Sequence, residues 1–186
     1  MALVVFLRGV NVGGHKAFRP SVLARKLAKY AVVNVGAAGT FVVRKPISQA
    51  RLRVELRRRL PFEAEVMICS ARALIRFASG EPFAGEASGP GVVRFVSMLA
   101  KRPRALPTLP LSLPGPDDWV VKVTAVRGRF AFGLYRRMMR AIAFLSQLEK
   151  RLGVPATTRN WNTITTILEV LRAGGADEWR QSKDDK

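Results

Sequence analysis

A glycine-rich loop near the start of the chain offers residues suited to anion binding. It reads Arg8-Gly-Val-Asn-Val-Gly-Gly-His-Lys16. Glycines let backbone N–H groups converge on an anion, and Arg8 and Lys16 can neutralise its charge. A tight turn in which Asn11 bonds its own backbone explains the same residues equally well. The predicted anion ligands in this loop are Arg8, Asn11, Gly13, Gly14, His15 and Lys16.

The loop departs from the common nucleotide-binding patterns. Gly9 and Gly14 have the spacing of the phosphate loop of nucleotide hydrolases, but His15 stands where that loop requires lysine. Ala17 occupies the position where a hydroxyl group would hold magnesium. A dinucleotide fingerprint is also missing, because no second glycine follows Gly9 two positions on. An anion site in this loop would therefore follow none of these common nucleotide-binding patterns.

A second candidate lies near the other end, at Thr157-Thr-Arg-Asn-Trp-Asn-Thr163. The apolar spacing predicts a helix over about 159–171, capped by Thr157 or Thr158. Backbone N–H groups of its first turn would then face an anion. Trp161 begins the apolar stripe and is interpreted as core, with stacking on a base as the alternative. The predicted ligands here are Thr158, Arg159, Asn160 and Asn162.

A third group combines Arg136, Arg137 and Arg140 with Phe132 and Tyr135. Basic residues beside aromatic residues are typical of nucleic-acid binding. A solvated helix end next to core aromatics is the commoner explanation, and we expect a helix over about 136–152.

Catalytic and metal-binding side chains are scarce. His15 is the single histidine, so a histidine-based metal site is excluded, and no metal or cofactor is assigned. Cys69, the single cysteine, lies in an apolar run and is predicted to be a buried, inert thiol. Glu63 and Glu65 alternate on a predicted strand, and Asp117-Asp118 is typical of a turn. No catalytic residue is predicted.

The chain is strongly basic, with 32 Lys and Arg against 13 Asp and Glu. Such a field favours polyanions, although an arginine-rich composition also arises from genome composition. The expected partner is therefore a nucleic acid or an anionic small molecule. No membrane partner is expected, and no segment resembles a targeting peptide or a membrane span, so a cytoplasmic location is predicted.

Periodicity predicts a mixed fold. Strands are expected over about 2–7, 31–35, 40–44, 65–69, 92–98, 119–126 and 129–134, with helices over about 20–30, 46–60, 70–77, 136–152 and 159–171. The first six elements follow the β-α-β-β-α-β order of the ferredoxin-like fold. The pattern partly restarts at residue 92, where a Pro-rich connector, 103–116, replaces a helix.

The fold class expected is therefore α/β (α+β), with two ferredoxin-like βαββαβ-type halves packed together and C-terminal helices. The expected halves span residues 1–79 and 80–175, and 176–186 is expected to be a flexible tail.

The motifs at Phe6–Gly14 and Thr157–Thr163 resemble those of an uncharacterised bacterial family, domain-of-unknown-function family 1697 (DUF 1697). The resemblance covers the chain to about residue 172 and implies two ferredoxin-like halves. It implies no activity. One departure is Ala38-Gly39-Thr40, where the family usually has a serine-glycine-asparagine turn.

Three functions remain open. The leading hypothesis is a protein that binds a phosphate-bearing ligand or nucleic acid through the glycine loop and the basic helix start. The alternatives are a small-molecule enzyme acting on an anionic substrate and a protein-interaction module. A concave pocket lined by the motifs would favour a small ligand, and an exposed apolar patch would favour a protein partner.

Overall fold

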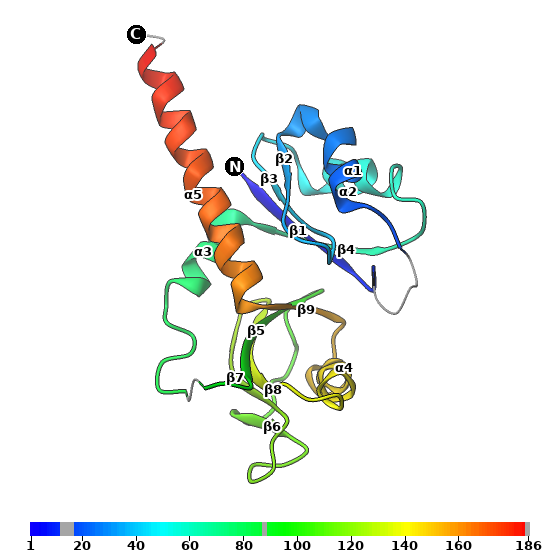
Figure 1. Ribbon diagram of the computed structural model, residues 1–186, viewed down its shortest axis with the longest axis vertical. Coiled ribbons are helices and arrows are strands. Elements are labelled where there is room, and N and C mark those ends of the chain that lie inside the picture. The colour runs from blue at the N-terminus through cyan, green and yellow to red at the C-terminus, as the bar shows by residue number, and fades with distance from the viewer. Residues whose placement is uncertain (12–16, 87–88, 185–186) are drawn as a thin grey trace. The chain divides into compact units, whose positions relative to one another are not determined.

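The computed structural model describes residues 1–11, 17–86 and 89–184, which form two units (Figure 1). Unit 1 contains Met1–Ile75 and Thr163–Lys186, and unit 2 contains Arg76–Asn162. Each holds one antiparallel sheet, so the chain has a mixed α+β fold with C-terminal helices, as predicted. The expected halves, 1–79 and 80–175, are each continuous, whereas unit 1 consists of two segments of the chain, because most of the final helix belongs to it. No helix among the described residues is both long and apolar enough to cross a membrane.

Unit 1 has the ferredoxin-like arrangement. Its sheet has the strand order β2-β3-β1-β4, with every neighbouring pair antiparallel. Helices lie between its first and second and between its third and fourth strands. The elements are β1 (Leu3–Arg8), α1 (Pro20–Lys26), a 3-10 turn η1 (Ala28–Tyr30), β2 (Val32–Asn34), β3 (Thr40–Val43), α2 (Gln49–Arg57), β4 (Glu65–Ser70) and α3 (Ala71–Ala78).

Two helices bury one face of this sheet. Pro20 begins α1, where its missing N–H costs nothing, and Ser48 caps α2 by accepting a hydrogen bond from the Arg51 N–H. The apolar sides of the helices then meet the inward residues of β1, β3 and β4. The buried set includes Leu3, Val5, Leu7, Leu23, Leu27, Phe41, Leu52, Leu56 and Ile68.

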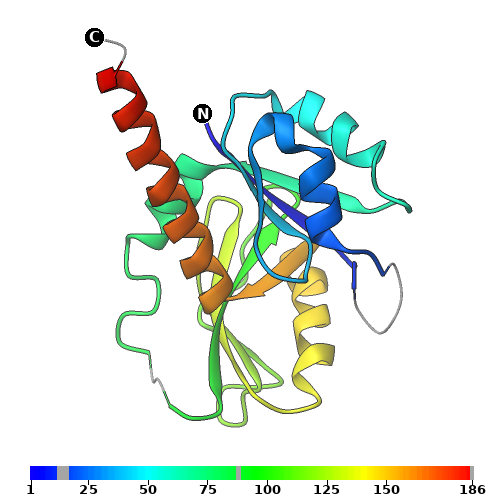
Figure 2. The ribbon, with the colours of Figure 1, turned by 45° about the horizontal axis from the view of Figure 1, so that its top comes forward.

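Unit 2 repeats that strand order with one strand added at its edge, β6-β7-β8-β5-β9. In the described chain no helix lies between β5 and β7, and α4 packs against one face of the sheet (Figure 2). Its elements are β5 (Val92–Leu99), β6 (Leu111–Leu113), β7 (Val121–Arg127), β8 (Phe130–Arg136), α4 (Ala141–Leu152) and β9 (Ala156–Asn160). The short β6, inside the Pro-rich connector, was not predicted.

The largest error of the sequence-based prediction concerns the Thr157–Thr163 motif. Thr157, Thr158, Arg159 and Asn160 belong to β9, not to a helix start, and α5 spans Trp161–Asp184. Pairing with β5 overrides the expected cap, since two adjacent threonines also favour a strand.

Helix boundaries differ elsewhere in the same unit and at the end of the chain. The helix predicted from residue 136 begins at Ala141, because Arg136 pairs with Val92 in the sheet. Helix α5 continues through Gly174 and Gly175, where an end was expected, to Asp184. The Arg44 guanidinium donates to the Val170 carbonyl at 3.1 Å and ties α5 to unit 1.

Candidate functional site

The first loop places its described residues in structural contacts. Arg8 forms a 3.2 Å ion pair with Glu65, its partner across the β1–β4 ladder. Asn11, at φ 53°, donates to the Ala37 carbonyl at 2.7 Å and accepts from the Phe18 N–H at 2.9 Å. The Asn11 side chain therefore links Phe18 to Ala37, which precedes β3. The predicted ligands Gly13, Gly14, His15 and Lys16 lie outside the described residues.

Two residues of the second motif also make internal contacts. The Thr158 hydroxyl bonds the buried Ser97 hydroxyl at 2.7 Å across the β5–β9 ladder. The Arg159 guanidinium is buried and donates to the Thr157 hydroxyl at 2.9 Å and to the Thr158 carbonyl at 2.8 Å. Burial lowers the pKa of Arg159 to about 10, so it stays charged at neutral pH.

The rest of this motif helps to line a hollow in unit 2, hereafter the junction hollow. Strand β5 lies between β8 and β9 and is antiparallel to both, so β8 and β9 end where β5 begins. Tyr135 stands opposite Val93, and Asn160 opposite Phe95. The first residues of α5 follow directly. The hollow of about 380 Å³ is lined by Gly89, Val92, Val93, Arg94, Tyr135, Arg137, Asn160, Trp161 and Asn162.

The junction hollow has the chemistry of an anion site. Arg94 and Arg137 bring two guanidinium groups to it, and no carboxylate is among its described lining residues. Asn160 and Asn162 add amide groups, and α5 begins there, which places the positive end of its dipole near the hollow. Two arginines and two amides can donate several hydrogen bonds to a phosphate group.

Phe83 contacts two residues that line the junction hollow, Trp161 and Arg94. Its ring meets that of Trp161 edge to face, with centroids 4.9 Å apart, and lies 5.4 Å from the Arg94 guanidinium carbon. The Arg94 Nε is buried and, within the part of the chain that the structure describes, donates no hydrogen bond. Trp161 is half-buried, so it both packs on Phe83 and faces the hollow.

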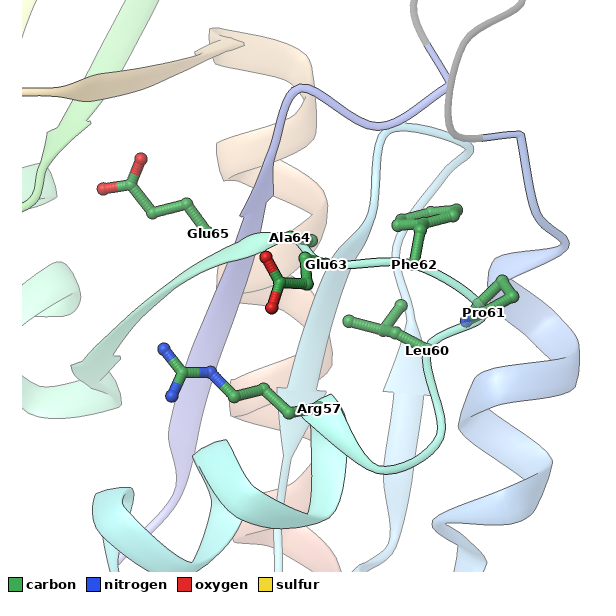
Figure 3. Close-up of a pocket in the computed structure, with 7 residues that line it drawn as sticks. All are labelled: Arg57, Leu60, Pro61, Phe62, Glu63, Ala64 and Glu65. Carbon is green, nitrogen blue, oxygen red and sulfur yellow. The ribbon is translucent and has the colours of Figure 1, made fainter.

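A larger hollow, of about 780 Å³, lies in unit 1 and has a different character. Figure 3 shows Pro61 and Phe62 at one end of it, with Arg57, Glu63 and Glu65 toward the other. Glu65 already pairs with Arg8 at 3.2 Å. Two carboxylates and one guanidinium give this hollow no net preference for an anion. Among the described residues, no three His, Cys, Asp or Glu side chains gather to hold a metal ion.

The sequence analysis singled out five residues that line the junction hollow, but it did not predict that they lie together. Tyr135 and Arg137 belonged to one candidate cluster, and Asn160, Trp161 and Asn162 to another. Antiparallel pairing around β5 brings the two clusters together. Arg94 was missed, although a charged residue inside the apolar run of β5 was a usable signal.

Comparisons with known proteins give a family and a fold. The model of a family described as "Protein of unknown function (DUF1697)" matches residues 1–123, a range that ends before the Thr157–Thr163 motif. No curated protein matches the chain. One solved structure, that of the conserved bacterial protein SP0830 from Streptococcus pneumoniae, is similar with a TM-score of 0.55 and 15% identity. The likeness covers 91% of this chain and 98% of that one, and it shows the fold alone.

Proposed function

Because this chain belongs to the DUF1697 family, whose description states no activity, we propose its function from its own residues: it binds a phosphate-bearing small ligand in the junction hollow. The observation that carries the proposal is the meeting of Arg94 and Arg137 with Asn160 and Asn162 around one concave space. Its volume, about 380 Å³, lies within the range usual for small-molecule sites.

Each group has a role in the proposed complex. Arg137 is exposed and supplies a guanidinium that can grip two phosphate oxygens at once. Arg94 supplies a second charge from a half-buried position held against Phe83. The side chains of Asn160 and Asn162 complete the hydrogen bonding, and the Tyr135 and Trp161 rings offer flat surfaces for the organic part of the ligand.

Binding is favoured over catalysis by the same residues. No carboxylate, histidine, cysteine or lysine lines the described hollow, so it offers no general base in the neutral range and no activated nucleophile. An enzyme acting on an anionic substrate and a cytoplasmic location both remain predictions. A protein-interaction module also remains one, and the exposed Met139 (93%) and Ile142 (71%) on and beside α4 are the apolar side chains it would use.

Calorimetric titration with inorganic phosphate, pyrophosphate and the common ribonucleotides tests the proposal. Arg137→Ala removes a charged donor and should weaken the binding of the best ligand by about 10- to 100-fold. Arg94→Met, which keeps an apolar contact with Phe83, should weaken it similarly. The matched control is Arg140→Ala, because Arg140 does not line the hollow and its side chain makes exposed contacts, a 3.8 Å pair with Asp118 and a 3.3 Å hydrogen bond from Nε to the Met138 sulfur.

Two results would refute the proposal. One is the absence of binding by all of these probes at low salt. The other is an equal loss in Arg140→Ala and Arg137→Ala, which would assign the binding to overall charge rather than to the hollow.

A further inference from the structure

Four basic side chains surround a second hollow in unit 2, away from the residues that line the junction hollow. Four basic residues line this hollow of about 430 Å³ and are hereafter the basic tetrad: Lys101, Arg104, Lys150 and Arg151. The other lining residues are Ala105, Leu152, Gly153 and Val154. All four basic residues are exposed, and no carboxylate is among the described lining residues, so the tetrad forms a positively charged patch.

Backbone pairing brings the tetrad together from two distant segments. Lys101 and Arg104 follow β5, whereas Lys150 and Arg151 lie in the last turn of α4. Leu99 pairs with Ala156, and the Ala100 N–H donates to the Pro155 carbonyl at 2.9 Å. The chain leaving β5 is thereby held beside the chain entering β9, which starts just after α4 ends. The arrangement is fixed by the sheet and not by the basic side chains themselves.

A stabilising role within the fold is evident for only two of the four basic residues. Lys150 and Arg151 suit the negative end of the α4 dipole, which stabilises cations there. Lys101 and Arg104 add two more positive charges to the same place, and within the described residues none of the four forms an ion pair. Repulsion among them opposes the fold. A bound polyanion would relieve that repulsion.

The lining residues select one kind of polyanion. Leu152 and Val154 are 2% and 4% exposed, so the patch presents no large apolar side chain to insert into a bilayer. No aromatic ring is among the lining residues that the structure describes, so they offer no platform for stacking bases. What remains is a cluster of two guanidinium and two ammonium groups around one hollow, which can pair with backbone phosphates and so give affinity without sequence preference.

We propose that the basic tetrad of Lys101, Arg104, Lys150 and Arg151 binds the phosphodiester backbone of a nucleic acid without sequence preference. This site is independent of the junction hollow, which takes a small ligand through other residues. The composition of unit 2 agrees with such a partner, because it carries 14 basic residues against five acidic ones.

The test is fluorescence anisotropy with labelled single-stranded and duplex oligonucleotides of mixed sequence, over about 50 to about 200 mM salt. The full chain is compared with a variant in which Lys101, Arg104, Lys150 and Arg151 are all changed to Gln. The plot of log K against log salt has a negative slope, and the loss of four phosphate contacts should make that slope less steep by roughly three. At the low-salt end we expect binding to weaken by at least about 50-fold.

The matched control changes two other lysines and two other arginines to Gln, namely Arg25, Lys26, Lys45 and Arg51. All four are exposed and lie in unit 1, so the net charge falls by the same amount. A circular dichroism melt shows that both variants fold. A loss of binding confined to the tetrad variant, with the slope reduced as stated, supports the proposal.

Three outcomes overturn it: no binding of either oligonucleotide at low salt, an equal loss in both variants, or binding to anionic phosphatidylglycerol vesicles without binding to oligonucleotides. Titration of the tetrad variant with the small ligand of the junction hollow separates the two proposals. That titration should be unchanged, and a failure of the small-ligand experiment leaves the oligonucleotide result standing on its own.

Discussion

Unit 1 has helix α1 between its first two strands, whereas unit 2 has the Pro-rich connector and the short strand β6 in the equivalent place. Nevertheless the four shared strands take the same order, with β1, β2, β3 and β4 corresponding to β5, β7, β8 and β9. Each second crossover contains a helix that buries two leucines, Leu52 and Leu56 in α2 or Leu148 and Leu152 in α4. The comparison indicates that strand register and the second helix specify this arrangement, and that the first crossover can vary.

Ion pairing distinguishes the two basic hollows of unit 2 from parts of unit 1, although unit 2 also has pairs of its own, Lys122 with Glu86 at 2.7 Å and Arg140 with Asp118 at 3.8 Å. In unit 1, Arg8 pairs with Glu65, and Lys29 and Arg59 both lie within 4 Å of Glu55. In unit 2, the basic residues lining the junction hollow and the tetrad have no such partner among the described residues. Two of the tetrad residues, Lys101 and Arg104, lie in the crossover between β5 and β7, before β6.

The largest effect should come from Gly133→Ala in β8. A Cβ there would lie 2.3 Å from the Lys122 carbonyl oxygen and 2.7 Å from the Phe95 ring, so backbone must move. We expect a loss of more than about 3 kcal/mol in the free energy of unfolding, measured by urea denaturation. Gly115→Ala is the control, because a Cβ there meets nothing within 4 Å.

Hydrogen exchange on Gly133→Ala sharpens the comparison. Amides of β7 and β8 should lose protection more than those of β1 and β3, because the clash lies inside the sheet of unit 2. A loss spread evenly over both sheets would mean that the two units do not behave as separate units.

The correspondence of α2 and α4 predicts similar costs for Leu52→Ala and Leu148→Ala. Both side chains are buried, with 0% and 1% exposure, so each truncation should cost about 3 kcal/mol in chemical denaturation. Ile142→Ala, at a site 71% exposed on α4, should change stability by less than about 0.5 kcal/mol. A cost for Leu148→Ala near that of the control would break the correspondence.

A smaller effect is expected at the hydroxyl pair of Ser97 and Thr158, which bonds β5 to β9 at 2.7 Å. Ser97→Ala leaves one half-buried hydroxyl without this partner and should cost about 1 to 2 kcal/mol. Thr158→Val should cost a similar amount, and the double variant less than the sum. Strict additivity in this double-mutant cycle would show that the bond contributes nothing.

The smallest effect is a dependence on alkaline pH caused by Arg159. Burial lowers its pKa to about 10, so the unfolded chain holds the proton more tightly than the folded one. The penalty for burying the charge is complete below pH 10 and shrinks as pH rises above 10. The wild type should therefore gain up to about 1 kcal/mol per pH unit relative to Arg159→Met above pH 10. A difference that stays constant through pH 11 would contradict the lowered pKa.

Local sequence patterns predicted most elements but not the partners of the last strand. The apolar run of β1, the proline at the start of α1 and the serine before α3 are local signals, and the structure confirms all three; the Ser70 hydroxyl accepts from the Ala73 N–H at 3.2 Å. Cys69 is buried, as predicted. Thr157–Asn160 carried a helix-cap signal, yet their strand conformation depends on β5, some sixty residues earlier in the chain.

Local sequence patterns likewise did not predict which residues meet at the candidate site. Arg137 and Asn160 were singled out separately, whereas their common hollow follows from β8 and β9 flanking one strand. Lys101 and Lys150 gave no sequence signal at all, because nothing local relates a connector to a helix end fifty residues later. Predicting either site would have required the strand register as well as the residue types.

The division of unit 1 into two segments has a consequence for synthesis. Residues 76–162, which make up unit 2, leave the ribosome before Thr163 and the rest of α5, although Met1–Ile75 emerge first of all. Unit 2 is therefore the first unit whose segments are all available for folding during translation. The bond from Arg44 to the Val170 carbonyl can form only afterwards. A released chain that ends near residue 162 would carry all of unit 2 and lack the part of the final helix that belongs to unit 1.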